Sequence, residues 1–225
     1  AVPMLSLNNV FSQTELDAFD VRVSTLLQKQ GIAVSTLTYC VEPKFDGLAL
    51  SIVYKDGIIF QAATRGDGFT GEDVTENVKT IKDIPWNIKG YFEQKGIPVP
   101  SRVEVRGEVF MTHKSFEETN KLAILNGEKP KVNPRNAASG TIRQLDSEVV
   151  KERKLECYLY YLVEAAKYGL KTHVESIEFI EKLGFKTTKI FEKHTDFSNL
   201  EKSIQKWEKA REELDYETDG LVIKV

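Results

Sequence analysis

The sequence contains little that would crosslink the chain or anchor it in a membrane. Its 225 residues include only two cysteines, Cys40 and Cys157, which lie far apart and match no metal-ligand spacing. Both sit in apolar, β-rich stretches, so we expect buried free thiols and a reducing compartment, the cytoplasm. No apolar run approaches the roughly 18 residues of a membrane span, and no basic start precedes an apolar core near residue 1. These absences exclude a disulfide scaffold, a cysteine zinc site, a transmembrane protein and an exported protein.

No excess of one charge marks the chain either. It has 31 basic and 34 acidic residues, so its composition does not indicate a nucleic-acid binder, although a local basic surface can exist. Hydrophobic residues make up 41% of the chain, enough to fill the core of one large domain or two small ones. The chain begins with Ala1 and stops at a strand pattern, GLVIKV, with no exit turn. We therefore expect a fragment of a longer protein.

Changing periodicities predict a mixture of helices and strands. A capping box, Ser12 to Glu15, and a stop residue, Gly31, predict a first helix; its apolar face comprises Leu16, Phe19, Val23, Leu26 and Leu27. Period-two patterns predict an antiparallel meander over 38–44, 48–54 and 58–64, with turns at the two Asp-Gly pairs, Asp46-Gly47 and Asp56-Gly57. Further strands are expected at 102–111, 155–163 and the C-terminal end; further helices are expected up to about 80 and at 115–125, 174–183 and 200–214, with a proline-containing connector before 102. Because strands and helices do not alternate regularly, we expect an α+β fold with antiparallel or mixed sheets flanked by helices.

The segment GDGFTG, residues 66–71, fits the dinucleotide-binding pattern G-x-G-x-x-G. The strand before it leaves a tight hairpin and must be antiparallel to its neighbour, whereas the dinucleotide motif needs a parallel crossover. The helix expected next begins with Glu72, Asp73 and Glu76, whose charges would repel a phosphate. We therefore expect a plain loop, in which Arg65 is a candidate phosphate or ribose contact.

Charged residues share one face on each of three expected strands, because side chains two residues apart point the same way. Such faces are usually solvated. Three strands that each carry a glycine and opposite charges nevertheless favour a shared polar cleft, in which Gly107 would leave room for a ligand or a backbone. The charged sets are Glu42, Lys44 and Asp46; Glu104, Arg106 and Glu108; and Asp219 with Lys224.

A lysine in such a cleft can act as a nucleophile only after it loses a proton, and neighbouring carboxylates oppose that loss. Second cations, such as Lys224, Arg65 or a Mg²⁺ ion held by carboxylates, favour the neutral amine. Attack by Lys44 on phosphorus in a metal-assisted site is therefore chemically reasonable.

The segment KFDG, Lys44 to Gly47, fits the Lys-x-Asp-Gly signature of the covalent nucleotidyltransferases, which include DNA ligases, RNA ligases and mRNA capping enzymes. Other segments follow in order around it: MLSL, ATRGDGFTGEDVTENVKTI, VEVRGEVF, NPRNAASGTIRQLD and YETDGLVIKV. With these segments the chain resembles, from Met4 to Val225, the adenylation domain of the bacterial NAD⁺-dependent DNA ligases. The resemblance implies the covalent nucleotidyltransferase fold, a monomer in the bacterial cytoplasm, and a part in DNA replication and in the repair of DNA damage.

The resemblance also implies the reaction and the residues that serve it. Lys44 would attack the adenylyl phosphorus of NAD⁺, release nicotinamide mononucleotide (NMN) and carry AMP, which then passes to the 5′-phosphate of a nick in double-stranded DNA for sealing. The implied catalytic residues are Lys44, Asp46 and Lys224; the implied nucleotide-binding residues are Ser6, Leu7, Glu42, Lys44, Arg65, Glu108, Asp219 and Lys224. Of these, Glu42 would contact the adenine, Arg65 and Glu108 the ribose region, and Asp219 and Lys224 the phosphates. The implied ligands of Mg²⁺ or Mn²⁺ are Asp46, Glu108 and Asp219.

Two arginines, Arg135 and Arg143, match arginines that serve the nicked-DNA step in this family. The residues themselves also predict a positive patch, because four cations, Lys129 and Lys131 included, face only two nearby acidic residues. A solvated loop followed by a helix start is the plainer alternative.

Two other functions fit parts of the sequence. An ATP- or GTP-dependent nucleotidyltransferase, such as an RNA ligase or a capping enzyme, shares Lys-x-Asp-Gly and parts of the other strand motifs. A non-catalytic nucleic-acid-binding module would have lost the lysine or a strand-face carboxylate, and neither is lost. The family's N-terminal nicotinamide-binding subdomain and its C-terminal oligonucleotide-binding, zinc, helix-hairpin-helix and BRCT domains are not matched within 1–225. We therefore expect this chain to bind the adenosine half of NAD⁺ or AMP, to adenylate itself poorly and to seal nothing.

Overall fold

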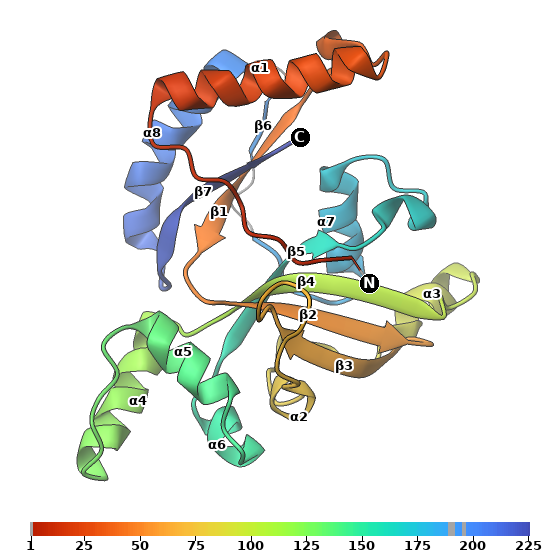
Figure 1. The fold of residues 1–225 in the computed structure, drawn as a ribbon. Coiled ribbons are helices and arrows are strands. Elements are labelled where there is room, and N and C mark those ends of the chain that lie inside the picture. Colours follow the sequence, from red (N-terminus) through yellow and green to blue (C-terminus); the bar gives the residue numbers. More distant parts are fainter. Residues whose placement is uncertain (1, 189–191, 195–196) are drawn as a thin grey trace.

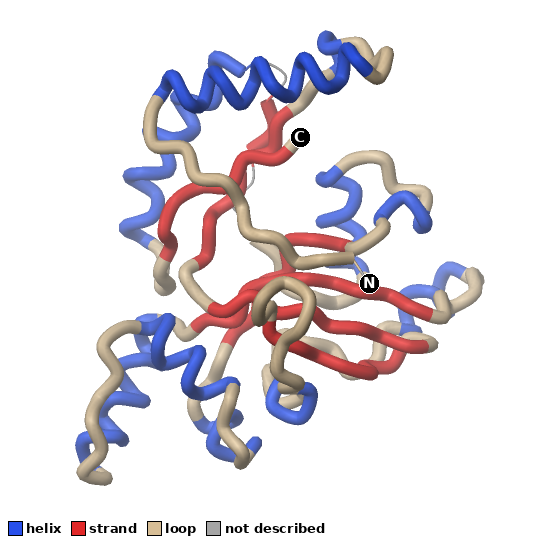
Figure 2. The backbone as a smooth tube through the Cα atoms, in the orientation of Figure 1, coloured by secondary structure: helices blue, strands red, loops and turns tan. Residues whose placement is uncertain are grey.

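The computed structural model describes residues 2–188, 192–194 and 197–225. Two antiparallel sheets form its framework and stand as separate groups of strands (Figure 1, Figure 2). The three-stranded sheet has the order β6 (Glu192–His194), β1 (Tyr39–Phe45), β7 (Thr218–Lys224); the four-stranded sheet has the order β3 (Ile58–Thr64), β2 (Leu48–Lys55), β4 (Arg102–Phe110), β5 (Glu156–Leu162). The helices are α1 (Gln13–Lys29), α2 (Thr75–Val78), α3 (Lys89–Lys95), α4 (His113–Leu125), α5 (Pro134–Ile142), α6 (Ser147–Glu152), α7 (His173–Lys182) and α8 (Leu200–Ala210). The expected α+β class is confirmed.

The four-stranded sheet carries the larger core. Alternate residues of β2 and β4 point to one face and are fully buried there, including Leu50, Ile52 and Val105. Ile142 of α5 and Ile180 of α7 belong to the same buried cluster. The period-two pattern read from the sequence therefore has its physical basis in the removal of this face from water.

The three-stranded sheet has a smaller core, formed by Tyr39 and Val41 of β1 against Leu200 of α8. Helix α1 runs across the end of this sheet where β1 begins (Figure 1) and contributes Phe19. Its predicted apolar face is only partly buried, since Leu26 is 59% exposed. Its capping box is also incomplete, because the Glu15 carboxylate accepts from the backbone N–H of Phe11 instead of the N-cap residue.

An aromatic cluster joins the two sheets. Phe45 at the end of β1 stacks on Phe110 at the end of β4, with ring centroids 5.6 Å apart. Tyr158 of β5 and Tyr216, which precedes β7, pack against the same two rings. This cluster fixes the end of β1, where Lys44 lies, against the four-stranded sheet.

The first Asp-Gly pair does not form the predicted hairpin, and the predicted three-strand meander is wrong in this respect. Strand β1 ends in one sheet and β2 begins in the other, so Asp46 and Gly47 carry the chain between sheets. A Cβ atom at Gly47 would lie 2.2 Å from the carbonyl oxygen of Val109, which explains the glycine. The second pair is the expected hairpin turn, because Asp56 and Gly57 both have the positive φ of a type I′ turn, 47° and 75°.

The glycine-rich loop does not open a helix, contrary to the prediction. The backbone N–H of Thr64 donates to the Glu72 carbonyl at 3.0 Å, and Asp73 forms an antiparallel bridge with Ala63. The chain therefore returns alongside β3, and α2 begins only at Thr75. Because β2 and β3 are antiparallel as expected, the dinucleotide-binding interpretation is rejected.

Most of the remaining elements agree with the sequence within a few residues, but some differ. Helix α3 lies in the segment expected to be a connector, and helix α6 and strand β6 had not been predicted. Helix α5 forms where the sequence offered only a loop and a helix start, and α8 ends at Ala210, where a 3₁₀ turn follows. Both cysteines are buried and free, as expected. Within the described ranges, no helix combines the length and the apolar character needed to cross a membrane.

Candidate active site

Lys44 lies near the end of β1, directly opposite Gly220 of β7. Its Nζ atom donates to both carboxylate oxygens of Asp219, at 2.7 and 2.6 Å. Gly220 has a φ of 144°, which favours glycine, and carries no side chain that would compete for this space. The side chains of Lys44 and Asp219 are 34% and 40% exposed, so a ligand can reach the ammonium group.

The crossing between the sheets brings further charged groups to Lys44. Asp46 accepts a hydrogen bond from Nη1 of Arg135, the second residue of α5, at 2.9 Å. Gly47 lies against Glu108 of β4, since a Cβ atom at Gly47 would lie 2.9 Å from Cγ of Glu108. Residues from β1, β4 and α5 therefore surround one point.

Glu108 has the ionisation behaviour expected of a functional carboxyl group. Burial raises its pKa from 4.5 to about 7, and the positive charges of Arg135 and Lys44 oppose this rise only in part. A carboxyl group with such a pKa can take up or release a proton near neutral pH. Strongly perturbed pKa values are also more frequent at functional sites than elsewhere.

Tyr160 of β5 links Glu108 to a second group of charges. The pairing of β4 with β5 shifts register between Arg106 and Gly107 and leaves Tyr160 as an extra residue in a β-bulge. Its hydroxyl donates to Oε2 of Glu108 at 3.4 Å, and its carbonyl oxygen accepts from Nζ of Lys224 at 2.9 Å. Bulges redirect side chains and occur often beside active sites. Sequence reasoning missed Tyr160 because a bulge leaves no mark on strand alternation.

We call Glu42, Lys224 and His173 the Glu42 cluster. Glu42 is 2% exposed; its Oε2 accepts from Nζ of Lys224 at 2.7 Å and its Oε1 accepts from Nε2 of His173. Burial alone would raise the pKa of Glu42, but the His173 hydrogen bond and the Lys224 charge outweigh burial and lower it. Burial lowers the pKa of Lys224, although Glu42 opposes this effect. The sequence had singled out the first two residues but not His173.

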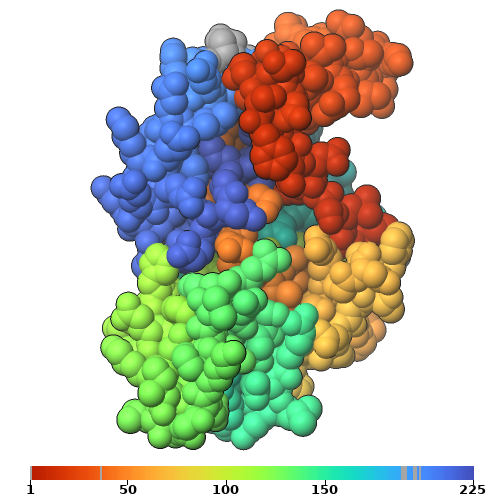
Figure 3. Space-filling view, turned by 60° about the vertical axis from the view of Figure 1, so that its left-hand side comes forward, coloured from red at the N-terminus to blue at the C-terminus, as the bar shows by residue number. Residues whose placement is uncertain are grey.

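Lys44 and the Glu42 cluster lie on one sheet face, with Glu42 only two residues from Lys44 on β1. Lys224 pairs with Cys40 in the register of β1 with β7, whereas Lys44 pairs with Gly220. Lys224 and Lys44 are thus four residues apart, or about 13 Å along the strands. In the space-filling view, the orange part of the chain that contains β1 reaches the surface between the blue C-terminal region and the red N-terminal segment (Figure 3).

The other predicted nucleotide contacts come from the N-terminal segment and the glycine-rich loop. Nη1 of Arg65 donates to Oγ of Ser6 at 3.1 Å. The Arg65 backbone N–H donates to the carbonyl of Ala49, which pairs with Glu108 in the sheet. Leu7 is 58% exposed. Arg65 and Ser6 therefore lie together, beside the strand that carries Glu108.

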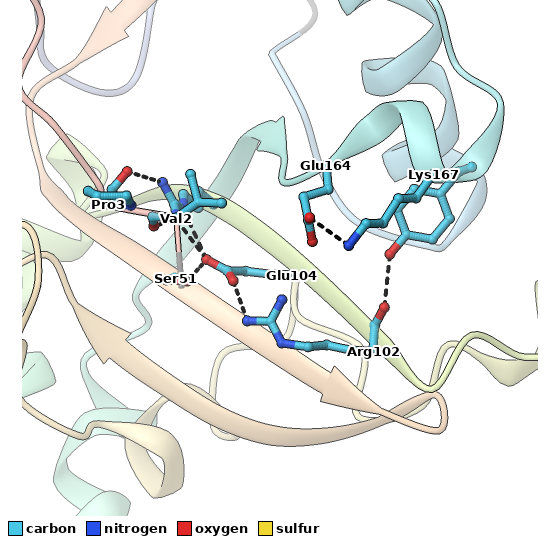
Figure 4. Close-up of polar contacts among 9 residues, drawn as sticks. Val2, Pro3, Ser51, Arg102, Glu104, Glu164 and Lys167 are labelled. Carbon is cyan, nitrogen blue, oxygen red and sulfur yellow. Dashed lines mark hydrogen bonds and ion pairs between the residues drawn. The ribbon is translucent and has the colours of Figure 1, made fainter.

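Two charges of the β4 face lie outside this site, so the expected cleft shared by all three charged faces forms only in part. Arg106 donates to Oε1 of Glu104 at 2.9 Å and to the backbone carbonyls of Val2 and Pro3. The N-terminal segment thus covers this part of the strand, and only Glu108 of the three approaches Lys44. Figure 4 shows this network, whose other members include Ser51 and Arg102.

The two arginines of the predicted positive patch reach different places. Arg135 pairs with Asp46, whereas Arg143, at the other end of α5, donates to Oε2 of Glu72. Arg143 also lines a groove of about 480 Å³ with Lys129 and Lys131. The patch is therefore divided between the candidate active site and this groove, which we call the basic groove.

The three carboxylates expected to bind a metal ion do not form a metal site by themselves. Asp219 is paired with Lys44, and Asp46 is paired with Arg135. In the part of the chain that the structure describes, no three His, Cys, Asp or Glu side chains gather closely enough to hold a metal ion. These residues therefore do not fit a resident Mg²⁺ ion held by the protein alone.

Known DNA ligases are similar to the chain over almost its whole length. The family described as "NAD-dependent DNA ligase adenylation domain" matches residues 1–225. A protein named DNA ligase from Fusobacterium nucleatum is 49% identical over 223 residues, which are 99% of this chain and 30% of that protein. A DNA ligase from Ureaplasma urealyticum is 44% identical over 99% of this chain and 31% of its own length. A DNA ligase from Thermosipho africanus is 43% identical over 100% of this chain and 32% of its own length.

A solved structure named "Pmar-Lig_Pre." has a TM-score of 0.49 and 16% identity, and it covers 90% of this chain and 40% of that chain. The chain spans about a third of the length of the three DNA ligases that it matches. Because the family match extends over all 225 residues, the chain belongs to the NAD-dependent DNA ligase adenylation domain family.

Proposed function

We propose that this chain carries out the adenylation step of an NAD⁺-dependent DNA ligase. Nζ of Lys44 forms a bond to the adenylyl phosphorus of NAD⁺, the bond from this phosphorus to the bridging oxygen breaks, and NMN leaves. The lysine-bound AMP then passes to the 5′-phosphate of a nick, where the 3′-hydroxyl displaces it within the longer protein. The observation that carries the proposal is the position of Lys44, accessible among opposite charges in a chain of the adenylation family.

The attack requires a neutral amine, so the ammonium group of Lys44 must first lose a proton. Asp219 holds this group with both oxygens, while the Lys44 side chain stays 34% exposed. Glu108 is the proposed proton acceptor, because its pKa of about 7 lets it take up a proton near neutral pH. Arg135, bound to Asp46, supplies positive charge that would stabilise the phosphate oxygens as the bond forms.

The adenine would bind at the Glu42 cluster. Glu42 offers an acceptor for the 6-amino group, and Lys224 beside it offers a donor for the neighbouring ring nitrogen. These contacts support a role for Lys224 at the base, whereas the family resemblance implied a role at the phosphates. Arg65 and Ser6 would then face the ribose region, and Leu7 would line the same nucleotide.

The second substrate would be nicked duplex DNA. Three cations line the basic groove, and lysine and arginine side chains that neutralise phosphates supply most of the affinity for DNA. Arg143 would exchange its partner Glu72 for a phosphate. The buried free thiols support a reducing compartment, the bacterial cytoplasm.

The experiment is to incubate the chain with NAD⁺, digest it, and locate the covalent AMP adduct by mass spectrometry. We expect the adduct on Lys44 and its loss in Lys44→Ala. Lys55→Ala is the matched control, because Lys55 also stands beside an Asp-Gly pair but is exposed next to a plain hairpin turn. Slow reaction does not weaken the test, since the position of the adduct is measured and not its rate.

Retention of the adduct in Lys44→Ala, or its appearance on another residue, would refute the role of Lys44. A parallel incubation with ATP separates the two classes of nucleotidyltransferase. An adduct that forms with ATP and not with NAD⁺ would contradict the proposed function.

A further inference from the structure

His173 has no assigned role in the proposed reaction, yet it contacts two of the residues proposed to bind the adenine. Its side chain is 11% exposed. Its Nε2 atom bonds to Oε1 of Glu42 and lies 3.2 Å from Nζ of Lys224. A buried polar side chain in such a place needs an explanation of its own.

The position of its proton follows from the other members of the cluster. Glu42 is ionised because its pKa is lowered, so its carboxylate only accepts hydrogen bonds. The Nε2 atom of His173 must therefore carry a proton and donate it to Oε1. Lys224 donates to Oε2 of Glu42 and to the Tyr160 carbonyl. Each carboxylate oxygen thus has one donor and keeps a second lone pair free for a ligand.

The helix that carries His173 holds it rigidly. Thr172 caps α7 by accepting from the Glu175 backbone N–H at 3.2 Å, while the Glu175 carboxylate accepts from the Thr172 backbone N–H at 3.0 Å. This complete capping box fixes the first turn. Ile177 and Ile180 are buried in the core of the four-stranded sheet, and α7 lies beside β5 (Figure 1).

His173 therefore connects the two sheets at the Glu42 cluster. Glu42 belongs to the three-stranded sheet, whereas α7 is anchored to the four-stranded sheet. Lys224 alone could bind either oxygen of Glu42 and would leave the carboxylate free to rotate. With a fixed donor on Oε1, the carboxylate has one orientation relative to both sheets.

We propose that His173 is a positioning residue for adenine recognition, which sets the Glu42 carboxylate to accept the 6-amino group of the base. The inference rests on the proposed function, because it requires adenine at the Glu42 cluster. An oriented acceptor also excludes a base with a 6-oxo group, since two acceptors would then face each other. His173 would therefore contribute to the preference for adenine over hypoxanthine, although it need not touch the base.

The test measures the affinities of the 225-residue chain for AMP and IMP by calorimetry. We expect His173→Ala to weaken AMP binding about tenfold, equivalent to about 1.4 kcal/mol, and to bring the AMP and IMP affinities closer together. His173→Gln should restore both properties, because its Nε2 donor can occupy a similar position. His113→Ala is the matched control, since His113 is also the first residue of a helix and its Nε2 also contacts a glutamate, at 2.9 Å.

His173→Met fills the same space without a donor and replaces His173→Ala if circular dichroism shows that the alanine variant does not fold. Wild-type AMP affinity and an unchanged ratio of AMP to IMP in the donor-free variant would overturn this inference alone. Failure of His173→Gln to restore affinity, with its fold intact, would also overturn it. Absence of AMP binding by the wild type would overturn the proposed function together with it.

Discussion

Replacing Glu108 with glutamine should remove a pH-dependent part of the stability of this chain. Burial in the folded state raises the pKa of Glu108 from 4.5 to about 7. The folded protein therefore binds this proton more tightly than the unfolded chain does. The resulting stabilisation is complete below about pH 4.5 and is lost as the pH rises through about 7.

The size of the effect follows from the two pKa values. Their difference, at about 1.4 kcal/mol per pKa unit, corresponds to roughly 3.5 kcal/mol between the two limits of pH. Glutamine has nearly the same shape as glutamate and can accept the hydrogen bond from the Tyr160 hydroxyl, but it does not titrate. The free energy of unfolding of the wild type minus that of Glu108→Gln should therefore fall by about 2 to 3 kcal/mol between pH 5 and pH 8.

Urea denaturation at several pH values measures this difference without the salt that guanidinium would add. Other groups titrate in both proteins, so their contributions cancel. Glu118→Gln is the control, because hydrogen bonding and charge from Lys154 lower the pKa of Glu118. The free energy of unfolding of the wild type minus that of Glu118→Gln should therefore not fall between pH 5 and pH 8. A difference for Glu108→Gln that stays constant from pH 5 to pH 8 would refute the reasoning.

Two further predictions concern the framework around the site. Gly47→Ala should destabilise the fold by about 3 kcal/mol, because its Cβ would lie 2.2 Å from a carbonyl oxygen; Gly90→Ala in α3 meets no atom within 4 Å and should stabilise by about 0.5 to 1 kcal/mol. Equal effects of the two alanines in thermal unfolding would contradict the close approach at Gly47. Glu104→Ala should cost about 3 kcal/mol because it removes the carboxylate partner of buried Arg106, whereas Glu148→Ala breaks an exposed ion pair and should cost less than about 1 kcal/mol. Urea titrations of both variants measure these costs, and similar values for the two would show that burial of the pair does not matter.

Local patterns predicted most strands almost to the residue. The patterns at 48–54 and 58–64 correspond to β2 and β3, and the type I′ turn between them forms at Asp56 and Gly57. Such elements depend on alternation and on the φ angles that individual residues tolerate, which are properties of short segments. The predicted start of the helix after the glycine-rich loop was wrong. The chain first returns alongside β3, and this return depends on bonds to Ala63 and Thr64 that no local pattern contains.

The candidate site was predicted in part for the same reason. Alternation correctly placed Glu42 and Lys44 on one strand, and the family resemblance correctly indicated the adenylation-domain family. Neither approach found Tyr160 or His173, since one depends on a bulge in strand pairing and the other on how α7 docks against the core.

The sequence by itself determined the strand periods, the lysine signature and the family. The tertiary structure alone decided that the first Asp-Gly pair crosses between two sheets and that Lys44 meets Asp219, 175 residues further along the chain. It also decided the pKa of Glu108, because the burial that raises this pKa exists only after the two sheets have packed together. The physical reason is that periodicity encodes which face of a segment is apolar, whereas strand partners, charge pairs and burial depend on contacts between segments that are distant in the sequence.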